Sequence, residues 1–144
     1  MDDPKARKRV LILCTGNSCR SQMAEGWVRH DLGPRWEVAS AGTCPASIVH
    51  PLAVRVMAEA GVDISAATPK HVGTVAEQPW DLVVTVCDSA REVCPVFPAA
   101  AEQIHMGFRD PIMELRGEEE RLAAYRAVRD DIRTRLMPEI ARRS

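Results

Sequence analysis

The stretch from Cys14 to Ser21, which reads CTGNSCRS, constrains the fold and function of this chain more than any other part of it. An apolar run of β-type residues, Val10 to Leu13, precedes it, and a segment with helical periodicity follows it. A strand is therefore predicted to lead through a tight loop into a helix. The backbone N–H groups of such a loop form a nest for an anion, and the helix N-terminus adds positive potential there.

Two side chains in this stretch suit the chemistry of a tetrahedral oxyanion. Arg20 supplies a planar fork of N–H donors that can bind two oxygens of such an anion. Cys14 shares the positive environment, which favours thiolate over thiol and makes Cys14 a candidate nucleophile. The competing interpretation, a buried structural cysteine beside a turn, is the weaker one because a cysteine, five residues and Arg-Ser follow a strand here.

Length and composition predict one soluble domain. The chain has 144 residues, of which 46% are hydrophobic and 27% charged, so it can bury a core without disulfides. Residues 1–8 are interpreted as a flexible charged tail and residues 9–144 as the domain. A net charge of −1 argues against a nucleic-acid partner. No membrane-length apolar run or signal-peptide pattern occurs, so we expect a cytoplasmic monomer without a membrane partner.

Five cysteines in a reducing compartment are not expected to form a disulfide framework. No CxxC pair occurs, and no ligand spacing relates the cysteines to the four histidines, His30, His50, His71 and His105. We therefore predict no metal site and no cofactor. Cys19 lies near Cys14 in sequence and is expected to pack, although an oxidative pair of the two is the alternative. Cys44 is assigned no role.

Apolar runs alternate with helical patterns along the chain. Strands are predicted at 9–14, 36–41, 81–86 and 103–107, and helices at 19–32, 51–61 and 118–143. A further helical turn is expected after Pro69, residues 88–94 have a helix-compatible composition, and Pro138 should kink or break the last helix. The alternation predicts a single-domain α/β fold, an open four-stranded parallel sheet with helices on both faces.

Several chemical groups follow predicted strand ends, where parallel sheets bind ligands. Cys14, Cys87 and Asp110 all lie at such positions. Asp110 is the candidate acid for protonating a leaving oxygen, although an Asp-Pro pair alone is more often a turn. If the first and third strands are neighbours, about 4.8 Å apart, Cys87 could form a disulfide with Cys14, and Cys94 could then resolve it. Two buried structural cysteines are the alternative.

Taken together, these motifs resemble the thioredoxin-coupled arsenate reductases, which share their fold with the low-molecular-weight protein tyrosine phosphatases. The resemblance runs across nearly the whole chain. The segments that carry it are CTGNSCRSQMAEGW (14–27), SAG (40–42), DIS (63–65), DLVVTVC (81–87), CP (94–95), the H-x-GF-x-DP stretch at 105–111 and VRDDI at 128–132. The arrangement of three cysteines is specific to the reductases.

The resemblance implies a cysteine relay that reduces arsenate to arsenite. Cys14 would attack arsenate, and Asp110 would help a hydroxide leave as water. Cys87 would then attack Cys14 and release arsenite, and Cys94 would attack Cys87 to give a disulfide that thioredoxin reduces. The oxyanion-binding residues implied by the resemblance are Thr15, Gly16, Asn17, Ser18, Cys19, Arg20 and Ser21.

Two positions depart from the family pattern. Some relatives bind potassium near Asn17, Glu25 and Ser40 with an acidic residue from the segment after DIS. Lys70 stands at that acidic position here, so its ammonium could replace the cation but could not bind it. The second departure is an arginine at position 109, directly before the candidate acid, where close relatives have an acidic residue.

A tyrosine phosphatase is the main alternative function. It would use Cys14, Arg20 and Asp110 for phosphoryl transfer, but it has no use for the two further cysteines at 87 and 94. The aromatic residues that usually follow the Asp-Pro of the phosphatases are also replaced here by Ile112 and Met113. A non-enzymatic oxyanion-binding regulator or redox sensor is a third possibility, which retained arsenate binding without turnover would favour.

Overall fold

The computed structural model describes residues 7–86 and 100–144. The elements follow one another in the predicted alternation: β1 (Lys8–Cys14), α1 (Arg20–Leu32), β2 (Trp36–Gly42), α2 (Pro51–Glu59), the 3-10 turn η2 (Val72–Thr74), β3 (Trp80–Thr85), β4 (Ala100–His105), the 3-10 turn η3 (Pro111–Met113) and α4 (Glu118–Ala141). The tail residues 1–6, the helix-compatible segment 88–94 and both Cys87 and Cys94 lie outside the described residues. Within the described ranges, no helix has the length and apolarity that a membrane crossing needs.

The four strands form one parallel sheet in the order β2-β1-β3-β4. β1 lies in the middle, with Cys14 paired to Gly42 of β2 and Leu13 paired to Thr85 of β3. Residues Val10 to Leu13 are completely buried, as expected for a strand covered on both faces. The predicted condition for a thiol exchange, that the first and third strands are neighbours, is therefore confirmed.

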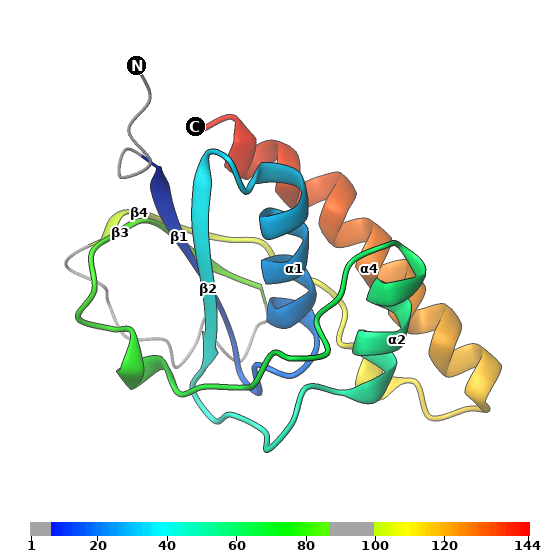
Figure 1. Ribbon diagram of the computed structural model, residues 1–144. Coiled ribbons are helices and arrows are strands. Elements are labelled where there is room, and N and C mark those ends of the chain that lie inside the picture. Colours follow the sequence, from blue (N-terminus) through cyan, green and yellow to red (C-terminus); the bar gives the residue numbers. More distant parts are fainter. Residues whose placement is uncertain (1–6, 87–99) are drawn as a thin grey trace.

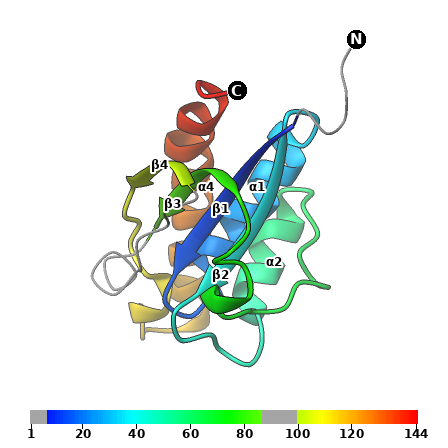
Figure 2. The ribbon, with the colours of Figure 1, turned by 90° about the vertical axis from the view of Figure 1, so that its left-hand side faces the viewer.

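The two faces of the sheet are covered differently, which Figure 1 shows from one side and Figure 2 after a quarter turn. On one face, α1, α2 and α4 enclose the main core, in which Trp27, Tyr125 and Ile132 are among the fully buried side chains. On the other face, the segment that contains η2 packs a smaller cluster against the sheet: Leu11, Leu13, Ala41, Val72, Val75, Trp80 and Val83. The predicted α/β fold with a four-stranded parallel sheet is confirmed. The sequence predicts helices on both faces; among the described residues the second face carries the 3-10 turn η2, which is the predicted helical turn after Pro69.

One predicted strand boundary is wrong. The fourth strand begins at Ala100 rather than at residue 103, because its exposed edge position requires few apolar residues that would mark it in the sequence. Of the two effects expected of Pro138, a kink or a break, the break does not occur: α4 continues past Pro138 to Ala141. Pro138 removes a single backbone donor, while Ile140 in the following turn is fully buried and holds that turn on the core.

Candidate active site

The loop between β1 and α1 brings three of the predicted catalytic residues into one pocket. The pocket has a volume of about 280 Å³ and lies at the carboxyl end of the sheet. Its lining residues are Cys14, Thr15, Gly16, Ser18, Cys19, Arg20, Asp110 and Ile112. Cys14, Arg20 and Asp110 are thus together, as the sequence predicts. The other two predicted catalytic residues, Cys87 and Cys94, belong to the part of the chain that is not described.

The shape of the loop depends on two backbone features. Asn17 adopts a left-handed conformation with φ of 49°, which asparagine tolerates better than most residues, and its N–H donates to the sulfur of Cys14 at 3.2 Å. Gly42 at the end of β2 approaches the loop so closely that a Cβ there would lie 2.4 Å from the carbonyl oxygen of Thr15. A glycine at position 42 is therefore a steric requirement of the oxyanion loop.

A directional chain of hydrogen bonds lies behind the loop. The Ser40 hydroxyl donates at 2.7 Å to the carboxylate of Glu25, which also pairs with the cations of Arg29 and Lys70. The Asn17 amide nitrogen then uses its two hydrogens for Ser40 Oγ at 2.9 Å and Ser21 Oγ at 2.8 Å. This leaves the Ser21 hydroxyl proton to point at Cys14 Sγ, 2.9 Å away. Donation to the sulfur favours the thiolate, which is the nucleophilic form.

In front of the loop, Arg20 is held in place and still has an unused donor. Its terminal nitrogens donate to the Phe108 carbonyl and to Asp110 Oδ2, both at 3.1 Å. Its Nε is buried and has no hydrogen-bond partner among the described residues. Buried donors without a partner are rare in folded proteins. An oxyanion bound in the adjacent pocket would provide the missing acceptor for Arg20 Nε. The backbone carbonyl of Phe108 thus helps to position Arg20, a role that the sequence did not indicate.

Asp110 forms the predicted turn and also lies at the pocket, where a candidate acid would have to be. Its Oδ1 accepts from the N–H of Ile112 and caps η3, as a turn-forming Asp-Pro does. Its Oδ2 is bound to Arg20 at the mouth of the pocket, and the side chain is 32% exposed. The carboxyl group therefore faces the site and also has access to solvent for proton exchange.

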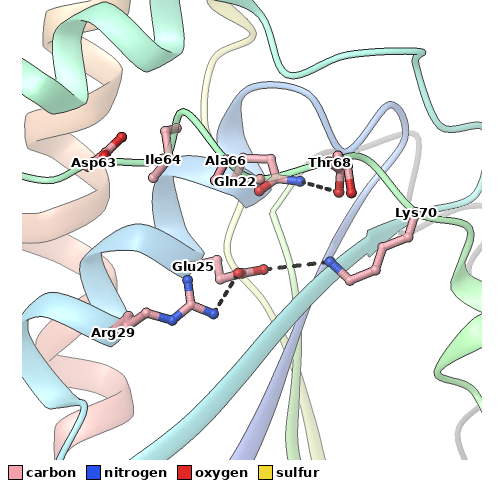
Figure 3. Close-up of a pocket in the computed structure, with 9 residues that line it drawn as sticks. Gln22, Glu25, Arg29, Asp63, Ile64, Ala66, Thr68 and Lys70 are labelled. Carbon is pink, nitrogen blue, oxygen red and sulfur yellow. Dashed lines mark hydrogen bonds and ion pairs between the residues drawn. The ribbon is translucent and has the colours of Figure 1, made fainter.

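A second and larger pocket, about 340 Å³ in volume, lies between α1 and the segment 63–70 and has no cysteine in its lining (Figure 3). In Figure 3 Glu25 lies between Arg29 and Lys70. The Arg29 guanidinium is 2.8 Å from Oε2 and the Lys70 ammonium is 4.0 Å from Oε1. The backbone N–H of Lys70 also donates to Asn17 Oδ1 at 2.9 Å. The Lys70 ammonium thus faces the same carboxylate that ends the hydrogen-bond chain to Cys14. Across residues 7–86 and 100–144, no group of three His, Cys, Asp or Glu side chains is placed to hold a metal ion.

Cys19 is buried, His50 is partly buried and Cys44 is exposed. Burial raises the pKa of Cys19, whose sulfur lies 3.7 Å from the hydroxyl oxygen of Tyr125, so Cys19 packs as a neutral thiol. Cys44 is exposed, and its backbone N–H donates to the Thr15 carbonyl. His50 caps α2 by accepting from Leu52 N, and burial lowers the pKa of its ring.

Known proteins match nearly the whole chain. The family model described as low molecular weight phosphotyrosine protein phosphatase matches residues 9–141. An arsenate reductase of Halalkalibacterium halodurans is 48% identical over 130 residues, which are 90% of this chain and 93% of that protein. A solved arsenate reductase in the phosphate binding state superposes with a TM-score of 0.80 at 30% identity and covers 95% of this chain and 99% of its own.

A thioredoxin-dependent arsenate reductase of Corynebacterium glutamicum superposes with a TM-score of 0.69 at 31% identity, covering 99% of this chain and 66% of that one. The two solved arsenate reductases therefore share the fold of this chain over nearly its whole length. The chain belongs to the low molecular weight phosphotyrosine protein phosphatase family, within which it groups with the arsenate reductases.

Proposed function

We propose that this protein reduces arsenate to arsenite with Cys14 as the nucleophile and a cysteine relay that thioredoxin regenerates. The observation that carries the proposal is one pocket lined by both Cys14 and Arg20: the Cys14 sulfur lies within hydrogen-bond distance of Ser21 Oγ and the Asn17 N–H, and the buried Nε of Arg20 has no partner among the described residues. A tetrahedral oxyanion would satisfy that donor and place its central atom near the sulfur.

In the first step, the Cys14 thiolate attacks arsenic, a sulfur–arsenic bond forms and one arsenic–oxygen bond breaks. The leaving oxygen needs a proton, and Asp110 is the group at the mouth of the pocket that can deliver one. Arg20 and the amides of the loop hold the other oxygens. The oxyanion-binding set of this proposal remains Thr15, Gly16, Asn17, Ser18, Cys19, Arg20 and Ser21.

In the second step, the Cys87 thiolate attacks the sulfur of Cys14. A disulfide forms, the sulfur–arsenic bond breaks, and its electron pair stays on arsenic, which leaves as arsenite in the trivalent state. Cys94 then attacks Cys87, frees Cys14 and leaves a Cys87–Cys94 disulfide for a thioredoxin dithiol to reduce. The neighbouring positions of β1 and β3 support this order, because the N–H of Val86 donates to Leu13 O directly beside Cys14.

Phosphate ester hydrolysis is the second candidate, because the same nucleophile, arginine and acid suit a phosphoryl group and the family model is that of a phosphatase. We propose it as a weak side activity. The protein is further proposed to act as a cytoplasmic monomer without a nucleic-acid or membrane partner.

The test is arsenate-dependent NADPH oxidation coupled through thioredoxin and thioredoxin reductase, with aryl phosphate hydrolysis measured in parallel. Cys14→Ser should abolish both activities, because both need the thiolate. Cys87→Ser and Cys94→Ser should stop reductive turnover and leave the hydrolysis intact. Cys44→Ser is the matched control and should retain both activities. Wild-type turnover by Cys94→Ser with thioredoxin would refute the relay.

A further inference from the structure

Large exposed apolar side chains gather at one place on this protein. Across the described residues, four such side chains are strongly exposed: Leu115 (86%), Met113 (69%), Ile48 (63%) and Ile112 (48%). Three of them follow Asp110 directly, and Ile112 lines the catalytic pocket. The fourth lies in the loop 43–50, whose backbone donates to the oxyanion loop at the carbonyls of residues 15, 16 and 18. The exposed apolar area therefore borders the mouth of the pocket.

Two arginines without an ion-pair partner lie near this exposed apolar area. Of the arginines in the described ranges, only Arg35, Arg109 and Arg121 have no carboxylate within 4.0 Å. Arg109 is exposed and directly precedes Asp110. Arg121 is close enough to His50 that its charge, after burial, helps to lower the pKa of that ring. Arg35 lies at the opposite end of the sheet, before β2.

An apolar patch with unpaired cations at its border has the composition of a protein interface. A small oxyanion does not need the side chains of Met113 and Leu115, which lie outside the pocket lining. The N–H of Phe108 donates to the carbonyl of Val86, the last residue described before the segment that carries Cys87 and Cys94. The apolar border thus adjoins the point where the chain enters the segment that a protein reductant must reach.

We propose that residues 109–115, together with Ile48 and Arg121, form the docking surface for the protein reductant. Charge complementarity defines the partner: a small protein dithiol whose contact face is apolar and bordered by carboxylates that pair with Arg109 and Arg121. The inference rests on the proposed function, because it assigns a surface to the reductant of that reaction.

The test separates docking from chemistry in the full-length enzyme. One variant combines Met113→Ser with Leu115→Ser, two others are Arg109→Ser and Arg121→Ser, and Arg35→Ser is the charge-matched control. The kcat/KM for thioredoxin is measured in the coupled assay at low and high salt. Single-turnover arsenite release from the pre-reduced enzyme, without thioredoxin, and turnover with dithiothreitol are measured in parallel.

The apolar double variant should lower kcat/KM for thioredoxin by about tenfold, the loss expected when an interface loses its central contacts. Each arginine variant should lower it by roughly two- to fivefold at low salt and by less at high salt, because exposed charges are screened. Single-turnover release and dithiothreitol turnover should stay at the wild-type level. Arg35→Ser should change nothing.

An unchanged kcat/KM for thioredoxin in the apolar double variant would overturn the docking surface. If the arginine variants instead slow single-turnover release at low arsenate, the two cations serve the oxyanion and not a protein. If only hydrolysis of a phosphotyrosine peptide falls, the occupant is a peptide and the proposal is wrong. Failure of the proposed function has a different signature, which is absence of arsenite release from the wild-type enzyme.

Discussion

The two sides of the oxyanion loop differ in how completely their polar groups are paired. Behind the loop, Asn17, Ser21 and Ser40 are fully buried and joined in one continuous set of hydrogen bonds. In front of it, Arg20 keeps a buried nitrogen without a partner in the described chain, and Asp110 is partly open to solvent. The rear side is therefore complete without a ligand, whereas the front side is completed only by one.

This difference assigns separate tasks to the two sides. An unpaired buried donor costs about 1–3 kcal/mol, so an oxyanion that accepts from Arg20 removes a cost that the free protein carries. The rear network keeps the loop in shape before the ligand arrives, so little reorganisation accompanies binding. Substitutions in front should thus remove activity with little loss of stability, and substitutions behind should change both.

Arg20→Lys, in front of the loop, is expected to have the largest effect on activity. Lysine retains the charge but loses the planar fork and the buried, unpaired Nε donor of Arg20. We expect kcat/KM for arsenate to fall by roughly 10²- to 10³-fold, as for removal of one donor from an oxyanion site. The coupled assay measures this loss, and thermal unfolding should show a nearly unchanged melting temperature. An activity within tenfold of wild type would mean that the front donor is not used.

Gly42→Ala tests the rear side with the next largest effect. The new methyl group would lie 2.4 Å from Thr15 O, so the oxyanion loop has to move. We expect a loss of about 1–3 kcal/mol in unfolding free energy, typical of overpacking, together with a clear drop in kcat/KM. Chemical denaturation and the coupled assay measure the two quantities.

The matched control for this substitution is Gly61→Ala. Gly61 has a φ of +83°, and no neighbouring atom lies within 4 Å of the position that a Cβ would take, so alanine there introduces strain far from the site. Stability should fall by about 1 kcal/mol while activity is retained. If both variants lost activity equally, the drop in Gly42→Ala would reflect stability and not the geometry of the loop.

Ser21→Ala removes the hydroxyl that joins the hydrogen bonds behind the loop to the sulfur of Cys14. Without the hydroxyl at 2.9 Å, the sulfur of Cys14 loses one of its two described donors, and the thiolate is less favoured. The alkylation of Cys14 by iodoacetamide can be followed by peptide mass spectrometry over a range of pH. The variant should reach the alkylation rate of the wild type only at a pH about one unit higher. Ser18→Ala is the control, since that hydroxyl contacts the sulfur of Cys19. Identical profiles for the wild type and Ser21→Ala would contradict the directional chain.

The sequence predicts the front side better than the rear side. Cys14, Arg20 and Asp110 are recognisable because their chemistry is unusual at strand ends, and the order of strands and helices follows from periodicity. The steric requirement for Gly42 could not be predicted in this way, because it depends on how closely the end of β2 approaches the oxyanion loop. The same reason hides Phe108, whose contribution is a backbone carbonyl and not a side chain. The course of α4 through Pro138 depends on burial of the last turn, which only the packed structure reveals.

Lys70 offers the prediction with the smallest expected effect, and it concerns the far end of the rear network. Its ammonium lies 4.0 Å from Glu25 Oε1, and its backbone N–H donates to Asn17 Oδ1. If the Lys70 ammonium replaces a bound cation, potassium should change the melting temperature and the turnover rate of the wild type no more than sodium does at equal ionic strength. Lys70→Asp replaces the cation by a second carboxylate beside Glu25.

That variant should gain a potassium-specific rise in melting temperature, because oxygen ligands from residues 25, 40 and 70 would then surround a position without positive charge. Lys70→Gln is the control: it removes the charge without adding a carboxylate, so it should lose less than about 1 kcal/mol and respond to both salts alike, since Lys70 is partly exposed. Thermal unfolding in potassium and sodium chloride distinguishes the three proteins. A potassium-specific stabilisation of the wild type would show that the ammonium does not take the place of the ion, and the rear network would then be incomplete without a ligand, just as the front is.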